Sequence, residues 1–279
     1  MDYTADPEIE SQGVFLPTVL RFAERHKDRT VLLVGCGDSY VQKISENKGR
    51  FPSNVIAPYI DSALMDELTN KERFYALCEE NGVPYPATFI HRSEMGNHFS
   101  LPFSAPYIVK PSNGVAYWKH PFPGQKKVFR AKDRAELEEV LAAVYGSGYT
   151  DSMVIQDFIP GDDTYMRVLT NYSDRFGKVR LMCLGHVLLE EHTPHGIGNH
   201  AVILTEQNRE LEETLRKLLD HLGYVGFSNF DIKYDRRDGT YRVFEINTRQ
   251  GRSNYYVTAA GANLAQYLVE DWIYGHPID

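Results

Sequence analysis

The segments Asn229-Phe230-Asp231-Ile232-Lys233-Tyr234 and Tyr241-Arg242-Val243-Phe244-Glu245-Ile246-Asn247 flank a turn signal at Asp238-Gly239. Apolar and polar side chains alternate in both segments, and Asp-Gly is a common pair in hairpin turns. Because side chains two residues apart share a face of a strand, Glu245 and Asn247 point the same way, as do Asp231 and Lys233. The sequence therefore predicts a β-hairpin with an acidic side chain on each strand.

The register of this hairpin decides whether its two acids meet. If residue 235 pairs with residue 241, Asp231 lies opposite Glu245, with facing Cβ atoms about 4.5–5.5 Å apart. Two carboxylates at this distance repel each other, and a divalent cation would remove the repulsion. Asn247 adds a neutral oxygen, and oxygen ligands without Cys or His favour magnesium. A solvated outer face of an edge hairpin explains the same alternation, so both interpretations stay open.

The composition is that of a globular protein with its own core. The chain has 279 residues, of which 42% are hydrophobic and 24% charged, which excludes collagen-like and disordered classes. Acidic residues outnumber basic ones by 38 to 30, giving a net charge of −8, so nucleic acid is not an expected partner. Three scattered cysteines, no signal-like N-terminus and no apolar run of about 18 residues favour a cytoplasmic protein without a membrane span.

The N-terminal part is predicted to be α/β. Helical spacing over residues 14–26 is followed by an apolar strand over 31–34 and the turn Gly35-Cys36-Gly37-Asp38. Because the third glycine of a dinucleotide-binding motif is missing, we interpret this stretch as a structural turn. A capping box with Thr69 as N-cap and Glu72 predicts the next helix, which ends near residues 81–82 before a proline-rich hinge.

The rest of the chain divides into a small α+β lobe and a larger C-terminal lobe. We expect lobes at residues 1–85, 86–163 and 164–279. Strands are predicted at 107–111, 127–130, 153–159, 164–171, 179–189 and 200–204, and helices at 133–145, 208–222 and 254–274. The histidine-containing loop from His192 through His195 to His200 is interpreted as an exposed or substrate-adjacent loop rather than a metal site.

Two lysines precede the hairpin in positions that suit phosphate binding. Lys110 ends an apolar strand before Pro111-Ser112-Asn113-Gly114, and Lys71 lies in the first turn of its helix. A surface charge is the alternative for each lysine alone. Arg252 and Ser253 follow a glycine and precede a helix, where they can bind a substrate carboxylate or simply cap the helix. Arg180 lies within an apolar strand pattern and needs a partner, so it is a further substrate-binding candidate.

The segment Glu245-Ile246-Asn247-Thr248-Arg249 resembles the E-x-N-x-R signature of the ATP-grasp superfamily. Asp231 matches its earlier metal acid, and Lys71 and Lys110 match its two phosphate lysines. Stretches 154–163, 182–186 and 244–253 are similar to the D-aspartate ligase family, and the resemblance covers residues 15–273. It implies an ATP-grasp fold of the α/β class with α+β lobes, in which the N-terminal α/β lobe is shortened.

The resemblance also implies a role for each matching residue. Gln156, Asp157, Phe158 and Ile159 would lie along the adenine, and Asp163, with Asp162 as alternative, would hold the ribose. Lys71 and Lys110 would bind the phosphates of ATP, while Asp231, Glu245 and Asn247 would hold Mg²⁺. Arg249, together with Lys110, would act catalytically by stabilising charge on the transferred phosphoryl group.

The implied activity is that of an ADP-forming carboxylate–amine ligase. By resemblance it would activate D-aspartate as an acyl-phosphate and join it to the lysine side chain of a peptidoglycan precursor. Two alternatives remain: a ligase for another amino acid or peptide, and a protein that binds Mg-ATP without ligase turnover. No surface feature of the sequence suggests a protein partner.

Overall fold

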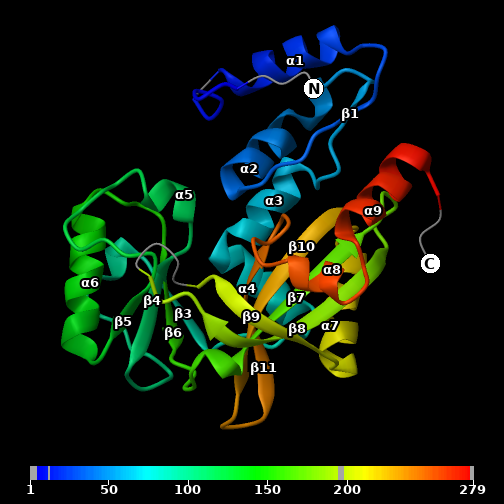
Figure 1. Cartoon of the computed structure of the whole chain (residues 1–279). Helices are drawn as coiled ribbons and strands as arrows, with labels where there is room; N and C mark the ends of the chain where they lie inside the picture. Colours follow the sequence, from blue (N-terminus) through cyan, green and yellow to red (C-terminus); the bar gives the residue numbers. More distant parts are fainter. Residues whose placement is uncertain (1–4, 12, 194–197, 277–279) are drawn as a thin grey trace.

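The predicted hairpin forms one edge of a five-stranded antiparallel sheet in the computed structural model, which describes residues 5–11, 13–193 and 198–276 (Figure 1). The strands follow one another in the order β11-β10-β7-β8-β9. Their bounds are Met166–Ser173 (β7), Val179–Glu190 (β8), His200–Glu206 (β9), Gly226–Asp235 (β10) and Thr240–Asn247 (β11). Helix α7, Arg209–His221, follows β9 and packs its leucines against the sheet.

The register of the hairpin is as predicted at the acids and different near the turn. Asp231 pairs directly with Glu245, which confirms the predicted juxtaposition. Asp235, however, pairs with Thr240 and not with Tyr241, so the predicted pairing at the turn was wrong by one residue. A β-bulge between these regions gives β11 one extra residue, Phe244, and restores the register.

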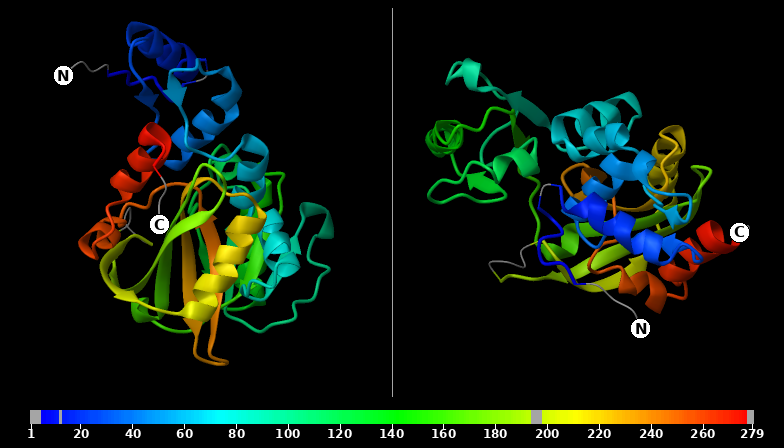
Figure 2. Two further views of the ribbon diagram at one scale, coloured as in Figure 1. Left: turned by 90° about the vertical axis from the view of Figure 1, so that its right-hand side faces the viewer. Right: turned by 90° about the horizontal axis from the view of Figure 1, so that it is seen from above.

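A second sheet of four strands forms a lobe beside the first, as the view from above in Figure 2 shows. Its order is β3-β6-β4-β5. The bounds are Thr88–His91 (β3), Tyr107–Pro111 (β4), Phe129–Ala131 (β5) and Met153–Asp157 (β6), with α5 at Gly114–Tyr117, η2 at Ser93–Met95 and α6 at Arg134–Gly146. The Asp133 side chain caps α6, and Leu137 and Leu141 of this helix belong to the core of the lobe.

The N-terminal elements begin at the top of the molecule in Figure 1 and descend to the level of the sheets. They are α1 (Phe15–Arg25), β1 (Val31–Leu32), α2 (Asp38–Asn47), η1 (Lys48–Arg50), β2 (Val55–Ile56), α3 (Ser62–Thr69) and α4 (Lys71–Glu80). The two short strands pair in parallel. The first helix lies within one residue of its predicted bounds, whereas the predicted strand over residues 31–34 is only two residues long.

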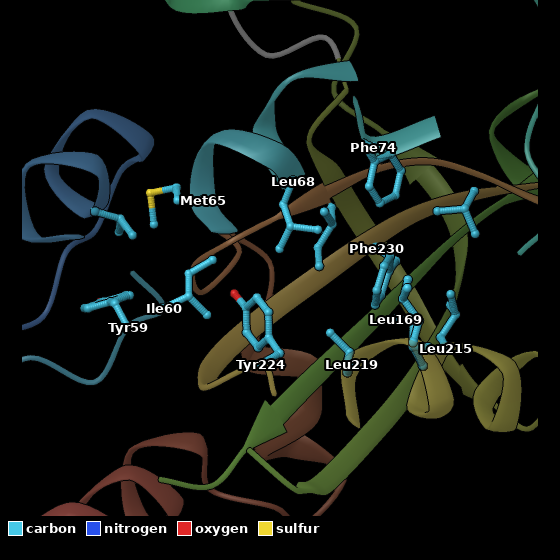
Figure 3. Close-up of a cluster of buried hydrophobic side chains, with 14 of the residues drawn as sticks. Tyr59, Ile60, Met65, Leu68, Phe74, Leu169, Leu215, Leu219, Tyr224 and Phe230 are labelled. Carbon is cyan, nitrogen blue, oxygen red and sulfur yellow. The ribbon is translucent and has the colours of Figure 1, made fainter. Parts of the chain in front are cut away.

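One hydrophobic core joins these N-terminal elements to the five-stranded sheet. Figure 3 shows a continuous row of buried side chains from Tyr59 and Met65, past Phe74, to Leu169 and Phe230 of the sheet. Each is at most 3% exposed. Because burial of apolar area is the main stabilising contribution, α3 and α4 are held against the sheet that carries the hairpin.

The cap of α4 differs from the prediction. Asn70, not Thr69, is the N-cap, and its side chain accepts a hydrogen bond from Arg73 N. Thr69 instead ends α3, and its hydroxyl donates to the Met65 carbonyl. Glu72 therefore does not complete a capping box and accepts a hydrogen bond from the Ser152 hydroxyl at 2.6 Å. Asparagine is as good an N-cap as serine or threonine, so the helix start moves by one residue.

The predicted C-terminal helix over 254–274 is wrong as a single element. The chain forms α8 (Tyr255–Ala259), α9 (Leu264–Val269) and a π-helical turn, η4 (Glu270–Tyr274). Gly261 has a φ of +108°, outside the helical region, and the side chain of Asn263 caps the start of α9. The 3₁₀ helix η3, Asp163–Tyr165, completes the described elements. Among the residues described, no helix has the length and apolar character needed to cross a membrane.

Gly226 marks a close approach between the N-terminal elements and β10. Its φ is +89°, and a Cβ built there would lie 2.3 Å from the Pro58 carbonyl oxygen. We expect Gly226→Ala to lower the free energy of unfolding by at least about 1–3 kcal/mol, because it adds this clash to an unfavourable backbone conformation. Chemical denaturation measures the difference. Gly239→Ala is the matched control, since φ is +77° there and its only neighbour within 4 Å is the Tyr234 hydroxyl at 3.9 Å; equal losses would contradict the prediction.

Candidate active site

A cavity of about 320 Å³ is lined by residues of both sheets. Strands β4 and β6 supply one wall, and β10 and β11 supply the other. Most of the residues predicted to bind nucleotide line it, namely Lys71, Lys110, Gln156, Asp157, Phe158, Ile159, Asp231 and Glu245. The fold thus brings together side chains from segments that are distant in the sequence.

Lys110 is buried at the end of β4, with only 6% of its surface exposed. Its Nζ donates to the Tyr75 hydroxyl at 2.8 Å and lies 5.4 Å and 5.6 Å from the ring centres of Tyr75 and Phe244. Burial, together with the nearby charge of Lys71, lowers the pKa of Lys110 to about 7. A buried lysine with little compensating charge is expensive, which is expected of a group that meets an anionic ligand.

Glu245 lies between two lysines on the opposite wall. Lys71 Nζ is 3.1 Å from Glu245 Oε2, and Lys127 Nζ is 3.9 Å from Glu245 Oε1. The positive charge of Lys71, with a contribution from Lys127, holds the pKa of Glu245 well below its usual range. Glu245 therefore stays ionised and orders Lys71 across the cavity.

Asp231 faces Glu245 and has a different environment. Burial raises the pKa of Asp231, although hydrogen bonds from His200 and Asn247 oppose the shift. Asn247 Nδ2 donates to Asp231 Oδ2 at 3.1 Å, and His200 Nε2 lies 3.7 Å from Asp231 Oδ1. Burial acts against a charged His200, but Asp231 and Glu190 outweigh it and raise the pKa of His200 to about 9.

The segment from Gln156 to Ile159 leaves β6 along the cavity, and neighbouring side chains hold it in place. Gln156 is buried, and its Nε2 donates to the Thr88 hydroxyl at 2.8 Å. Asp157 accepts a 2.6 Å hydrogen bond from Arg237. The Phe158 ring lies beneath Arg130, whose Cζ is 4.2 Å from the ring centre. This anchored segment offers an apolar surface and backbone groups to a planar ligand.

Asp163 and Asp162, the two ribose candidates, are not among the residues that line the cavity. Asp163 Oδ2 accepts hydrogen bonds from the Glu190 backbone N–H and from His192 Nε2, both at 2.9 Å. Asp162 caps η3 through Thr164. Asp163 therefore holds the end of β8, whose last residue, Glu190, does line the cavity. His195 of the predicted histidine loop lies outside the described residues.

Two of the three predicted substrate-binding residues also have local partners. Arg180 pairs with Asp174 at 2.7 Å and lies ten residues along β8 from Glu190, a distance of about 30 Å in a strand. Arg252 pairs with Glu191 at 3.1 Å. Neither these arginines nor Ser253 line a described cavity. Arg180 is therefore not part of the proposed site. Binding of a substrate carboxylate by Arg252 and Ser253 stays a prediction.

A second, wider cavity of about 600 Å³ adjoins the first and shares Lys71, Gly114, Trp118, Lys127 and Glu245 with it. Asn247 and Thr248 line it, as do residues of α2, α3 and α4. Arg249 follows directly, and its guanidinium forms two hydrogen bonds with Asp38 of α2, at 2.5 Å and 3.1 Å. The five shared residues, Glu245 among them, show that the two cavities are neighbours, and Arg249 is not among the residues that line either one.

Sequence reasoning missed four residues of the first site. Tyr75 and Lys127 were read only as parts of a helix and a strand, Glu190 as the end of a strand, and His200 as part of the histidine loop. All but Tyr75 line the cavity, and Tyr75 contacts Lys110. For Glu190 a signal existed, since an acid ending an apolar strand is as conspicuous as Lys110 ending another. Nothing in the sequence distinguished Tyr75 from the other aromatic residues on its helix.

The hairpin offers a donor set that fits a magnesium ion. Asp231 and Glu245 face each other across the strands. Asn247, whose Nδ2 donates to Asp231 Oδ2, would turn its amide oxygen to the ion. Among the described residues no cluster of three His, Cys, Asp or Glu could hold a metal, so phosphate or water oxygens would have to complete the shell. The raised pKa of Asp231 records the unfavourable burial of that carboxylate, which a cation would relieve.

Comparison with known proteins supports the sequence resemblance. An ATP-grasp domain matches residues 68–253. The chain is 46% identical over 278 residues to a D-aspartate ligase from Enterococcus faecium (strain Aus0004), covering 97% of this chain and 66% of that protein. The chain therefore spans just under two thirds of the length of this relative.

Solved structures show the same fold at low sequence identity. The L-amino acid ligase from Bacillus licheniformis aligns with a TM-score of 0.63 and 19% identity, over 95% of this chain and 61% of that one. The biotin carboxylase domain of Hydrogenobacter thermophilus 2-oxoglutarate carboxylase, solved with MgADP, aligns with a TM-score of 0.71 and 13% identity, over 96% and 59%. With the domain match covering most of the chain, these findings show that the protein belongs to the ATP-grasp family.

Proposed function

We propose that this chain is an ATP-dependent ligase that activates D-aspartate as an acyl-phosphate and joins it to an amine of a peptidoglycan precursor. The observation that carries the proposal is the 46% identity to a D-aspartate ligase over 97% of the chain. The lysine side chain of the precursor is the proposed amine. The two adjoining cavities support a two-substrate reaction, because the first is lined by the proposed nucleotide-binding residues and the second shares Lys71 and Glu245 with it.

In the first step, a β-carboxylate oxygen of aspartate forms a bond with the γ-phosphorus of ATP. The bond from that phosphorus to its bridging oxygen breaks, and ADP leaves. Lys71 and Lys110 offset the charge of the phosphates, and residues 156–159 lie along the adenine. Mg²⁺ held by Asp231, Glu245 and Asn247 would neutralise phosphate charge. The lobe of residues 86–163 covers the nucleotide and excludes water, which would hydrolyse the acyl-phosphate.

In the second step, the amine nitrogen attacks the acyl carbon. The carbon–oxygen bond to phosphate breaks, inorganic phosphate leaves, and the nitrogen loses a proton to give the amide. Arg249 follows the metal acids and pairs with Asp38, which lines the second cavity. We propose that its guanidinium stabilises charge on the phosphoryl group in both steps.

Hydroxylamine trapping tests this function. With ATP, Mg²⁺ and D-aspartate, we expect hydroxamate to form in proportion to ADP, because hydroxylamine intercepts the acyl-phosphate. A panel of D- and L-amino acids identifies the acid. Signal with a different acid alone would keep the chemistry and refute D-aspartate. Binding of Mg-ATP without hydroxamate from any acid would refute ligase activity in this chain and favour a nucleotide-binding protein without turnover.

A further inference from the structure

Asp38 directly follows the turn Gly35-Cys36-Gly37, and its side chain reaches the proposed active site. Gly37 is the N-cap of α2, and Asp38 is the first residue of this helix. Asp38 lines the second cavity. Its carboxylate oxygens accept hydrogen bonds from Nε and Nη2 of Arg249, at 2.5 Å and 3.1 Å. An acid in the first turn of a helix and a bidentate arginine pair are both favourable geometries.

The backbone around this turn fixes where Asp38 points. A Cβ at Gly35 would lie 2.7 Å from Val41 Cγ2, so only glycine lets the strand end pass this close to α2. The Gly35 N–H donates to the Tyr59 hydroxyl at 2.9 Å, and Tyr59 belongs to the main core. The turn is therefore held rigidly, and the start of α2 is aimed at the loop after β11.

Arg249 is held at its backbone, and Asp38 accepts two of the three hydrogen bonds described at its guanidinium. Asn229 Nδ2 donates to the Arg249 carbonyl at 2.5 Å, which ties the loop to the sheet. At the guanidinium, Nη1 donates to the Gln250 carbonyl at 3.1 Å, and Nε and Nη2 donate to Asp38. Arginine side chains lose much rotamer freedom when they are ordered, so a fixed partner lowers that cost for a group that must meet developing charge.

The exposure of the pair argues against a role in stability. The Asp38 side chain is 67% exposed and the Arg249 side chain 20% exposed. Ion pairs with an exposed partner contribute little to stability. Such a pair can still orient the guanidinium of Arg249.

We propose that Asp38 is a positioning residue for Arg249, so that the N-terminal α/β unit completes the site that handles the acyl-phosphate. The proposal rests on the proposed ligase function, in which Arg249 acts on the phosphoryl group. It gives the glycine turn a purpose that is neither purely structural nor dinucleotide binding.

Enzyme kinetics on the whole chain test this role. Asp38→Asn is expected to lower kcat for aspartate-dependent ADP release by about tenfold or more, since small misplacements of a positioned group are costly, with the KM for ATP nearly unchanged. Asp38→Glu should recover much of the loss. Glu46→Gln is the matched control, because Glu46 is exposed on the same helix, lines neither described cavity and accepts a hydrogen bond from Gln42.

Other kinetic outcomes would overturn the proposal. If Asp38→Asn behaves like Glu46→Gln, the Asp38 carboxylate has no role in turnover. A raised KM for the amino acid at constant kcat would instead make Asp38 a binder of the substrate ammonium group. A double variant Asp38→Asn with Arg249→Lys that is clearly slower than Arg249→Lys alone would mean that Asp38 acts independently of Arg249.

A second readout separates this proposal from the proposed function. In protein without nucleotide, the Nε–H resonance of Arg249, assigned by its loss in Arg249→Lys, should shift in Asp38→Asn and not in Glu46→Gln. An unshifted resonance would refute the pairing. If the unmodified protein releases no ADP in response to any acid, the ligase function fails, and this spectrum alone decides whether Asp38 orients Arg249.

Discussion

Replacing Glu245 by glutamine is expected to lower kcat for acid-dependent ADP release by about a hundredfold or more. Glu245 orders Lys71 through a 3.1 Å ion pair and is a proposed magnesium ligand opposite Asp231. Glutamine keeps the shape but loses the charge that both tasks need. Loss of one preorganised electrostatic group in an active site costs about 100–1,000-fold, and here one substitution affects a lysine and the metal together.

The measurement is steady-state ADP release under saturating ATP, Mg²⁺ and aspartate, with folding checked by circular dichroism and thermal unfolding. Glu213→Gln on α7 is the matched control, because Glu213 is half-exposed and pairs only with neighbours on its own helix. Folded Glu245→Gln protein with activity close to that of the control would refute both the metal assignment and the ordering of Lys71.

The hairpin was the part of the site that local pattern could predict. Alternation and an Asp-Gly turn indicate the two strands, and they place Asp231 opposite Glu245 as observed. The agreement depended on two features that compensate. The turn is one residue shorter than predicted, and the bulge at Phe244 adds one residue to β11, so the predicted register is restored at the two acids. A bulge leaves the hydrophobic alternation almost intact, so it is hidden from a pattern of period two.

Contacts between distant segments were beyond the reach of such patterns. The Asp38–Arg249 pair joins residues 211 positions apart, and the Lys110–Tyr75 hydrogen bond joins two different elements. Helical periodicity shows that Tyr75 faces a core, but not that its hydroxyl faces a lysine. Resemblance to a family supplied Lys71 and Lys110, whereas His200 could be placed only once β8 and β9 were seen to pair.

The prediction of a single C-terminal helix was wrong for a reason that lies in the segment itself and in its packing. Residues 254–274 have helical composition, and a single Gly261 among good helix formers costs only about 1 kcal/mol. The structure breaks the segment because Asn263 caps a new helix and Gly261 adopts a positive φ. The resulting turn places Val257 and Leu268 in one small core against Tyr172 and Phe227 of the sheet. Tertiary packing therefore overrode a weak local preference.

Lys110→Met is the second substitution with a large expected effect, and it separates activity from stability. We expect turnover to fall by about a hundredfold or more and the affinity for Mg-ATP by about tenfold or more, because the substitution removes a buried cation that we propose binds phosphate. The fold should be unchanged or more stable. Lys110 is 6% exposed and its pKa is lowered to about 7, so its charge opposes folding at neutral pH, and an apolar side chain of similar length removes that cost.

The pH dependence of stability gives this prediction its sign. A lysine whose pKa is lower in the folded state destabilises the fold while it is charged in the unfolded chain, up to its ordinary pKa of about 10.4. The free energy of unfolding of Lys110→Met should therefore exceed that of the unmodified protein most at pH 7 and below. This difference should become smaller as the pH rises toward 10. Urea unfolding at several pH values measures it, with the exposed Lys217→Met on α7 as the control. A variant that is less stable at pH 7, or that keeps its turnover, would show that Lys110 supports the fold rather than the phosphates.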